Sequence, residues 1–249
     1  MYILVTNDDG IQSPGLLALR QALDTVAETV VVAPERNWSA ASAARTLYDP
    51  LRIDMVAMAD GREAFVCTGT PGDCVALALL GFLERTPDLV VSGINIGPNL
   101  GNDVSYSGTV AAAREGTMMG VPSIAVSLNA RRDADFRPAA EIAARLAVAA
   151  VEHNLTPEIV LNVNVPSGEI RGIAVTHLGR RIYRDALVVR HDPRGRPYYW
   201  LGGDEPEGDL TEGTDTAAVA NGYVSLTPIH FDLTNERWLE ALRGWRLDG

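Results

Sequence analysis

The chain has 249 residues, of which 47% are hydrophobic and 21% are charged, a composition typical of a globular protein with a sizeable core. Its 32 acidic and 21 basic residues give a formal net charge of −11, which argues against binding to nucleic acid or to an acidic membrane surface, because both need a basic face. The chain has no lysine, which excludes Schiff-base chemistry and a Walker A loop.

Cysteine usage and the N-terminus indicate the compartment. The two cysteines, Cys67 and Cys74, lie too far apart for a CxxC motif, and we expect them to be buried thiols rather than a disulfide. The N-terminus opens directly into a strand-like run without the features of a signal peptide, and no apolar run is long enough to span a membrane. We therefore expect a cytoplasmic protein.

Strand-like and helix-like segments alternate through the first two thirds of the chain. Alternation of this kind favours βαβ units and a mainly parallel sheet, so the predicted class is α/β. The predicted strands are residues 2–6, 29–33, 51–55, 64–67, 89–91, 123–127 and 159–165. The predicted helices are residues 14–26, 73–83, 109–119 and 139–152.

The pattern changes near residue 172. Residues 186–191 and 197–201 are typical of a β-hairpin, and an acidic, glycine-rich loop, a helical turn, a strand at 223–227 and a terminal amphipathic helix at 235–245 follow. We predict a catalytic core at residues 1–176 and an extension at residues 177–249. The hairpin and tail either make subunit contacts or simply extend the sheet.

Oxygen-bearing side chains follow three of the predicted strands. Asp8 and Asp9 follow the first strand, Ser39 follows the second, and Asn95 follows the strand at residues 89–91. If these strands are parallel, the three loops lie at one edge of the sheet, where ligands of open α/β sheets bind. Such donors suit Mg²⁺ or Mn²⁺ and not zinc, although each loop alone is also explained by ordinary turn composition.

The segment Ser107-Gly108-Thr109 opens the predicted helix at residues 109–119. Hydroxyl groups and free backbone N–H groups at a helix N-terminus form an anion site, and beside a divalent metal the anion would be phosphate. The alternative is a plain Ser or Thr cap.

Other catalytic motifs are missing from the sequence. It contains no G-x-S-x-G and no G-x-G-x-x-G that follows a strand, and its four histidines are scattered. An aspartyl-phosphate phosphatase of the haloacid dehalogenase type needs Asp-x-Asp and a lysine, whereas here the aspartates are adjacent and lysine is missing.

With these residues in view, the chain resembles the SurE family, the stationary-phase survival proteins that act as metal-dependent nucleoside monophosphate phosphatases. The resemblance covers nearly the whole chain. The matching segments are Asn7-Asp8-Asp9-Gly10, Ala33-Pro34 with Ser39 and Ser42, Thr46-Leu47, Pro50-Leu51-Arg52, Gly69-Thr70-Pro71, Asp73-Cys74-Val75, Ser92-Gly93-Ile94-Asn95 through Thr109-Val110, Thr214-Asp215 and Gly222-Tyr223.

The resemblance implies a Rossmann-like three-layer core with a mainly parallel sheet and a C-terminal hairpin and helix that support a dimer or tetramer. It implies one divalent metal ion per subunit, Mg²⁺ or Mn²⁺, and hydrolysis of nucleoside monophosphates to nucleoside and phosphate. It leaves open 3′-nucleotides and short polyphosphate as substrates, and a noncatalytic metal- or nucleotide-binding module is the alternative. The implied metal ligands are Asp8, Asp9, Ser39 and Asn95, of which Asp8 and Asp9 are also catalytic, and the implied phosphate-binding residues are Asn37, Ser107, Gly108 and Thr109.

Two positions depart from the family pattern. Ala40 stands where the family usually has glycine, directly after the implied ligand Ser39. Gly72 stands where alanine is usual. Neither change removes an implied ligand, but Ala40 is expected to alter the loop that carries Ser39.

Overall fold

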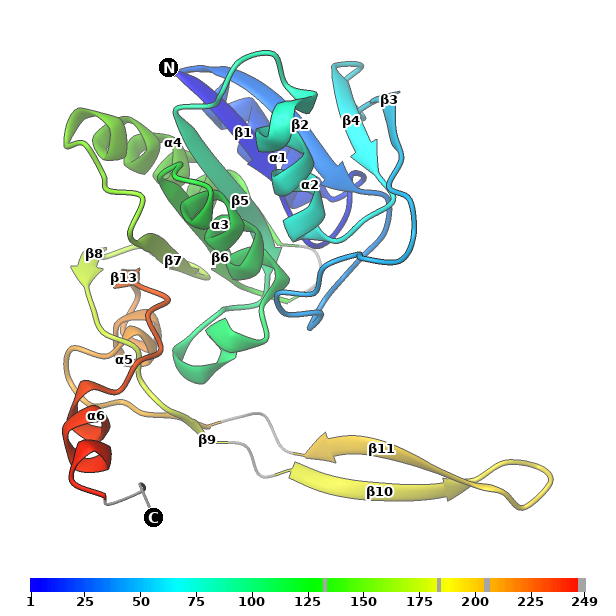
Figure 1. The fold of residues 1–249 in the computed structure, drawn as a ribbon, viewed down its shortest axis with the longest axis vertical. Helices are drawn as coiled ribbons and strands as arrows, with labels where there is room; N and C mark the ends of the chain where they lie inside the picture. Colours follow the sequence, from blue (N-terminus) through cyan, green and yellow to red (C-terminus); the bar gives the residue numbers. More distant parts are fainter. Residues whose placement is uncertain (132–133, 183–184, 204–206, 246–249) are drawn as a thin grey trace.

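The computed structural model describes residues 1–131, 134–182, 185–203 and 207–245 (Figure 1). The strands of its main sheet are Tyr2–Thr6 (β1), Glu28–Pro34 (β2), Ile53–Ala57 (β3), Glu63–Cys67 (β4), Leu89–Ile96 (β5), Ser123–Asn129 (β6), Val160–Pro166 (β7), Gly172–Val175 (β8) and Tyr223–Ile229 (β13). Two strand pairs stand apart from it: Arg181–Ile182 (β9) with Glu207–Gly208 (β12), and Asp185–His191 (β10) with Pro197–Gly203 (β11). The α-helices are Pro14–Leu23 (α1), Pro71–Leu77 (α2), Gly108–Met118 (α3), Arg137–Glu152 (α4), Asp215–Ala220 (α5) and Glu236–Arg243 (α6), with a π-helical turn at Ala78–Phe82 (η1) and a 3-10 turn at Gly101–Ser105 (η2).

The nine strands of the main sheet follow the order β3-β4-β2-β1-β5-β6-β7-β13-β8. The pairs β3–β4 and β7–β13 are antiparallel, and the other neighbours run parallel. The predicted α/β class with a mainly parallel sheet is confirmed. Because β1, β2 and β5 are parallel neighbours, the chain leaves all three at the same edge of the sheet.

Both faces of the sheet are covered, which makes the core three-layered (Figure 1). In β1 the side chains alternate: Ile3 and Val5 pack with α1 and α4, whereas Leu4 packs on the other face with Cys74 of α2 and Ala112 of α3. This two-sided burial explains why the strands at the centre are apolar runs rather than alternating sequences. It also buries Cys67 and Cys74 as free thiols, as predicted.

Helix α2 begins two residues earlier than predicted and ends sooner. Thr70 caps it in a capping box with Asp73, since the Thr70 hydroxyl accepts a hydrogen bond from the Asp73 N–H and the Asp73 carboxylate accepts one from the Thr70 N–H. After Leu77 the chain continues as the π-helical turn η1, where Gly81 has a φ of 119°. The predicted single helix at residues 73–83 is therefore wrong at both ends.

Strand β5 is longer than predicted and includes Asn95. The expected strand stopped at residue 91, but β5 continues to Ile96 after an irregularity between Ser92 and Asn95, and Asn95 pairs with Ser127 of β6. Gly93 permits this course because a β-carbon there would lie 2.4 Å from a backbone oxygen of β6. Asn95 is thus held by the sheet itself, and not by a loop.

The C-terminal part contributes to the main sheet and also projects from it. Strand β13 lies between β7 and β8, so the predicted extension at residues 177–249 supplies a strand of the central sheet. The predicted hairpin is present as β10 and β11, which point away from the core (Figure 1). The division at residues 176 and 177 stays a prediction. None of the described helices is long and apolar enough to cross a bilayer.

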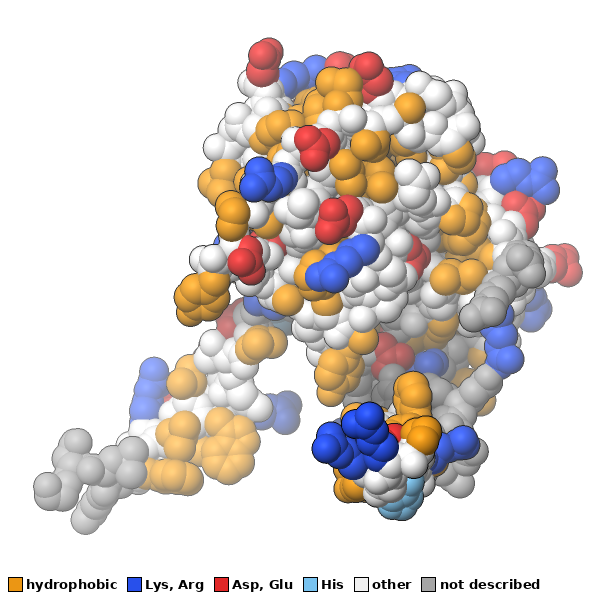
Figure 2. All heavy atoms as spheres, turned by 90° about the vertical axis from the view of Figure 1, so that its right-hand side faces the viewer, with side chains coloured by type: hydrophobic (Ala, Val, Ile, Leu, Met, Phe, Trp, Pro, Cys, Tyr) orange, Lys and Arg blue, Asp and Glu red, His pale blue; other side chains and the backbone are white. Residues whose placement is uncertain are grey.

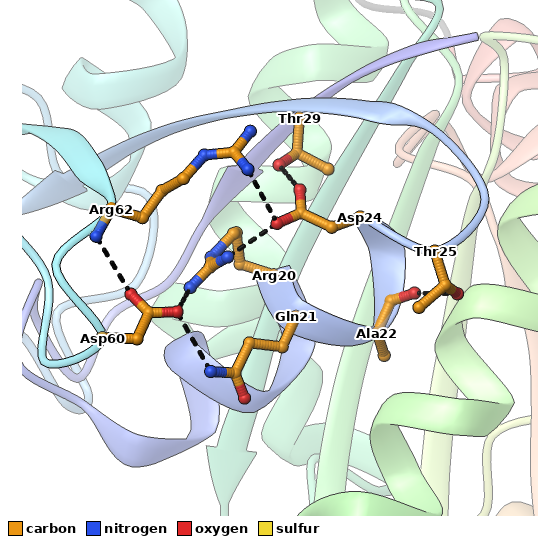
Figure 3. Close-up of polar contacts among 8 residues, drawn as sticks. All are labelled: Arg20, Gln21, Ala22, Asp24, Thr25, Thr29, Asp60 and Arg62. Atoms are coloured by element: carbon orange, nitrogen blue, oxygen red, sulfur yellow. Dashed lines mark hydrogen bonds and ion pairs between the residues drawn. The ribbon is translucent and has the colours of Figure 1, made fainter.

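A charged network ties the turn between β3 and β4 to helix α1 (Figure 3). Arg20, only 4% exposed, pairs with Asp24 at 2.6 Å and also with Asp60, and Gln21 donates to Asp60. These contacts lower the pKa of Asp60 to about 2. The network lies where α1 ends and β2 and β4 begin, at the opposite edge from the three loops, and we assign it a structural role.

Candidate active site

The carboxyl ends of β1, β2 and β5 bring together the residues singled out in the sequence. Asp8 lies two residues after the end of β1 and is 3% exposed, and Asp9 beside it is half-buried. The backbone N–H of Trp38, which follows β2, donates to the Asp8 carbonyl oxygen at 2.7 Å. The predicted convergence of the β1 and β2 loops at one edge is therefore confirmed.

Asp8 points toward the start of helix α3. The Thr109 hydroxyl donates to the Asp8 Oδ1 atom at 2.6 Å, and the backbone N–H groups of Gly108 and Thr109 also donate to this carboxylate. A β-carbon at position 108 would lie 2.7 Å from the Asp8 β-carbon, so only glycine allows the helix to approach this closely. The helix start and the carboxylate therefore form one hydrogen-bonded, closely packed unit.

The two carboxylates are electrostatically unfavourable neighbours. Burial raises the pKa of Asp8, although the hydrogen bonds from Thr109 and Gly108 oppose the shift. Burial, followed by the negative charge of Asp8, raises the pKa of Asp9 to about 6. Two desolvated carboxylates side by side would be stabilised as anions by a cation placed between them.

The loop after β2 reaches Asp9. Asn37 donates its side-chain N–H to the Asp9 Oδ1 atom at 3.0 Å, and the Asn37 Oδ1 atom accepts from the Ser39 N–H at 2.7 Å. Asn37 and Ser39 are both exposed. The structure therefore places the Ser39 loop beside Asp9, with Asn37 as the contact.

The end of β5 forms the other wall beside Asp9. The Asn95 Nδ2 atom donates to the Gly97 carbonyl oxygen at 2.8 Å, so its Oδ1 atom is the end of the amide available to a cation. A backbone hydrogen bond from Ile96 lowers the pKa of Asp9 and so opposes the effect of burial. Asn95 thus lies on the strand that borders Asp9.

The start of α3 is organised differently from the expected open anion site. Ser107 caps the helix by accepting a hydrogen bond from the Val110 N–H at 3.1 Å, and its own N–H donates to the Asp103 carbonyl oxygen. The N–H groups of Gly108 and Thr109 already serve Asp8. The sequence reasoning missed this link, because it depends on a contact across 101 positions of the chain.

Two buried polar side chains that the sequence reasoning missed hold the segment between β5 and α3. The Asn99 backbone N–H donates to the Asn164 Oδ1 atom at 2.7 Å, and its side chain donates to Ser127. Asp215, fully buried, accepts hydrogen bonds at 2.8 Å from the N–H groups of Gly101 and Gly179. Asp215 and Gly101 belong to motifs that carried the resemblance, which was the available signal.

The donor set fits a hard cation better than a soft one. The described residues contain no cluster of three or more His, Cys, Asp or Glu side chains, which a zinc site would need. Asp8 and Asp9 instead supply carboxylates, and Ser39 and Asn95 carry neutral oxygens on the adjoining segments. This chemistry fits Mg²⁺ or Mn²⁺, which keep several waters and bind through one or two carboxylates.

Comparison with known proteins shows the family of the chain. The family model described as "Survival protein SurE" matches residues 3–185. The chain belongs to the SurE family. A 5′-nucleotidase SurE of Chloroflexus aggregans is 59% identical over 98% of this chain and 99% of its own length, and one of Herpetosiphon aurantiacus is 57% identical over 97% of each.

The fold comparison extends the agreement to three dimensions. The crystal structure of the SurE protein from Aquifex aeolicus has a TM-score of 0.85 and 41% identity over 98% of both chains. Full-length coverage includes the C-terminal part that the family model leaves out. The expected SurE-like architecture is therefore confirmed beyond residue 185, where the match to the family model ends.

Proposed function

We propose that this SurE-family chain is a divalent-metal-dependent 5′-nucleotidase that hydrolyses nucleoside monophosphates to nucleoside and phosphate. The observation that carries the proposal is the meeting of Asp8 and Asp9 with the start of α3 at one edge of the sheet. Relatives that match nearly the full chain carry the name 5′-nucleotidase SurE. A metal-assisted phosphoryl transfer needs both a cation site and donors for phosphate oxygens.

Each residue has a defined task in this proposal. Asp8 and Asp9, with the Ser39 hydroxyl and the Asn95 amide oxygen, would hold Mg²⁺ or Mn²⁺. When bound, the metal polarises a phosphoryl oxygen and lowers the pKa of water. Thr109 and Gly108 fix the orientation of Asp8.

The substrate phosphate would lie between the helix start and the loop after β2. Ser107 keeps a hydroxyl hydrogen for donation, since its oxygen acts as the acceptor in the helix cap. The Asn37 Nδ2 group donates one hydrogen to Asp9 and has a second hydrogen to offer to a phosphate oxygen. Gly108 and Thr109, whose donors are engaged by Asp8, would then act on the phosphate through the positive end of the α3 dipole.

We extend the proposal to 3′-nucleotides and short polyphosphate as further substrates, because a site that recognises a phosphoryl group and a metal does not by itself select the leaving group. We also place the enzyme in the cytoplasm. The two free, buried thiols of Cys67 and Cys74 suit a reducing compartment.

The test is phosphate release from 5′- and 3′-nucleotides, an aryl phosphate and polyphosphate, each with and without Mg²⁺ or Mn²⁺. Asp8→Asn and Asp9→Asn are expected to cut turnover by about 100-fold or more. Near-normal turnover in both variants would contradict the assignment. Ligand binding without phosphate release would favour a noncatalytic module, and a trapped phospho-aspartate would favour the haloacid dehalogenase type.

We further propose that the hairpin β10–β11 and helix α6 make subunit contacts in a homodimer or homotetramer. Tyr199, Trp200 and Leu201 are 59%, 62% and 91% exposed, and none of the α6 residues is buried. Figure 2 shows hydrophobic and basic side chains together on the projecting part below the core. An isolated two-stranded hairpin with exposed aromatics is marginal alone, so a second copy would cover it.

Light scattering coupled to size exclusion tests this assembly. The full chain is expected to elute as a dimer or tetramer, and Trp200→Ser with Leu201→Ser is expected to shift it toward smaller species. A monomeric wild-type chain would contradict the proposal.

A further inference from the structure

A pocket of about 420 Å³ opens beside Asp9. Asp9 itself forms part of its wall. The rest of the wall comes from the loop between β1 and α1, the end of β5 and the segment before α4, represented by Gln12, Pro14, Ile96 and Phe136. The pocket and the proposed metal site therefore share a carboxylate.

The two aspartates lie next to elements that cover different faces of the sheet. Asp8 contacts α3, which packs with Leu4 on one face of the sheet. The pocket at Asp9 borders α1 and α4, which pack on the other face. Because Asp8 contacts the α3 start and the adjacent Asp9 lines this pocket, a monoester with its phosphate at the α3 start would have its organic group within reach of the pocket.

The lining selects the chemistry of that organic group. Among the described residues that line the pocket, none carries a positive charge, so an extended polyphosphate chain would have no counter-charge there. Phe136 and Ile96 supply an aromatic ring and an apolar side chain, and both are partly accessible. A flat, uncharged aromatic group stacks well on such a surface.

One polar side chain in the pocket can form hydrogen bonds with the edge of such an aromatic group. The Gln12 side chain is exposed and carries both a donor and an acceptor. No described residue forms a side-chain hydrogen bond with Gln12. The Gln12 amide is therefore available to donate to and accept from the polar groups on the edge of a nucleobase that lies on the aromatic surface.

We propose that this pocket binds the nucleobase of the substrate, with Phe136 stacking on the base and Gln12 contacting its edge. The proposal rests on the proposed function for the substrate class, and it adds the residues that distinguish a nucleotide from a bare sugar phosphate. The pocket volume falls in the range of small-molecule sites.

The experiment compares adenosine 5′-monophosphate with ribose 5-phosphate, which has the same phosphate and sugar but no base. Phe136→Leu keeps apolar bulk, which matters because Phe136 also packs against the core. In this variant the ratio of kcat/KM for the nucleotide over the sugar phosphate is expected to fall about tenfold, mainly through the KM for the nucleotide. The matched control Leu80→Ala, at a 72% exposed position in η1, is expected to leave the ratio unchanged.

Equal losses for both substrates, or an unchanged ratio in Phe136→Leu, would overturn the proposal. A second measurement separates it from the proposed function. Adenosine binding, followed by calorimetry without metal, needs no hydrolysis and is expected to weaken about tenfold in Phe136→Leu. Adenosine binding that depends on Phe136 in a protein without phosphatase activity would reject the proposed function and keep the pocket. Phosphate release from nucleotides, together with adenosine binding that Phe136→Leu does not change, would keep the proposed function and reject the nucleobase pocket.

Discussion

The start of α3 and the loop after β2 border the same pair of aspartates, Asp8 and Asp9, but the two segments are held in place in different ways. The α3 start is buried, and Thr109 and Gly108 fix Asp8 through hydrogen bonds and close packing. The loop after β2 is exposed, and Ala40 and Ser42 adopt positive φ values of 59° and 54°. One side of the site is thus preorganised by the core, whereas the other depends on a few hydrogen bonds at the surface.

The largest effect is expected from a change on the preorganised side. In Gly108→Ala the new β-carbon would lie 2.7 Å from the Asp8 β-carbon and 2.8 Å from its Oδ2 atom. Either Asp8 or the helix start must move, and a displacement of about 1 Å at a reacting centre costs about 100-fold in rate. Phosphate release from a nucleotide measures this loss.

Gly72→Ala is the matched control for that substitution. A β-carbon at position 72 would meet its nearest neighbours only at 3.8 and 3.9 Å, so alanine fits in the first turn of α2. Activity is expected to be unchanged, with a gain of about 0.5 kcal/mol in stability. Equal activity of the two variants would show that α3 does not fix Asp8.

The next effect concerns the hydroxyl that binds Asp8. Thr109→Val removes the 2.6 Å hydrogen bond and leaves a buried carboxylate oxygen with one donor fewer, which costs about 1–3 kcal/mol of unfolding free energy. Turnover is expected to fall about tenfold, since Asp8 loses an orienting contact. Thr109→Ser keeps the hydroxyl and should restore most of the turnover. A valine variant as active and stable as the serine variant would contradict the role of this bond.

Removal of the metal should expose the repulsion between the two carboxylates. The folded pKa of Asp9 is about 6, above the unfolded value, so protonation stabilises the metal-free fold at low pH. This contribution is complete below about pH 4, which is the unfolded pKa, and disappears as the pH rises through about 6. Asp9→Asn should therefore gain stability relative to wild type across that window.

Chemical denaturation at pH 4 and pH 7.5 measures the difference. After discounting for solvent around the half-buried Asp9, the relative gain is on the order of 1 kcal/mol in chelator. Saturating Mn²⁺ should remove the gain by stabilising the wild-type protein alone. A difference that stays the same at both pH values would contradict the raised pKa.

The smallest effect is expected in the exposed loop. Ala40 has a φ of 59°, a conformation that glycine adopts without the steric cost borne by alanine. Ala40→Gly is expected to change unfolding free energy by less than about 1 kcal/mol, because relief of strain is partly offset by the greater freedom of glycine in the unfolded chain. Thermal denaturation measures this change. A loss of more than about 1 kcal/mol of unfolding free energy would contradict the strain assigned to Ala40.

The same contrast explains how much could be predicted from the sequence. The buried strands and the positions of the oxygen-bearing side chains after them follow from local runs such as residues 2–6 and from turn chemistry beside them, so the sheet edge was predicted correctly. The continuation of β5 to Ile96 was not predicted, because it depends on how closely Gly93 approaches β6. Pairing with a distant strand overrode the local signal.

Local sequence patterns could not predict the polar contacts between residues far apart in the chain. The bonds from Thr109 to Asp8, and from Gly101 to Asp215, join positions that are 101 and 114 residues apart. A Ser-Gly-Thr segment at a helix start predicts donors, but only the packed fold shows that Asp8 is the acceptor. The pocket between Asp9 and Phe136 is likewise a product of three separate segments.

Anomalous diffraction from a crystal soaked in Mn²⁺ tests the central claim most directly. The account predicts one manganese peak between the carboxylates of Asp8 and Asp9, within coordination distance of the Asn95 amide oxygen and the Ser39 hydroxyl. Asp8→Asn with Asp9→Asn should abolish that peak. A peak bound elsewhere, or none at this edge of the sheet in a crystal that hydrolyses nucleotides, would contradict the account.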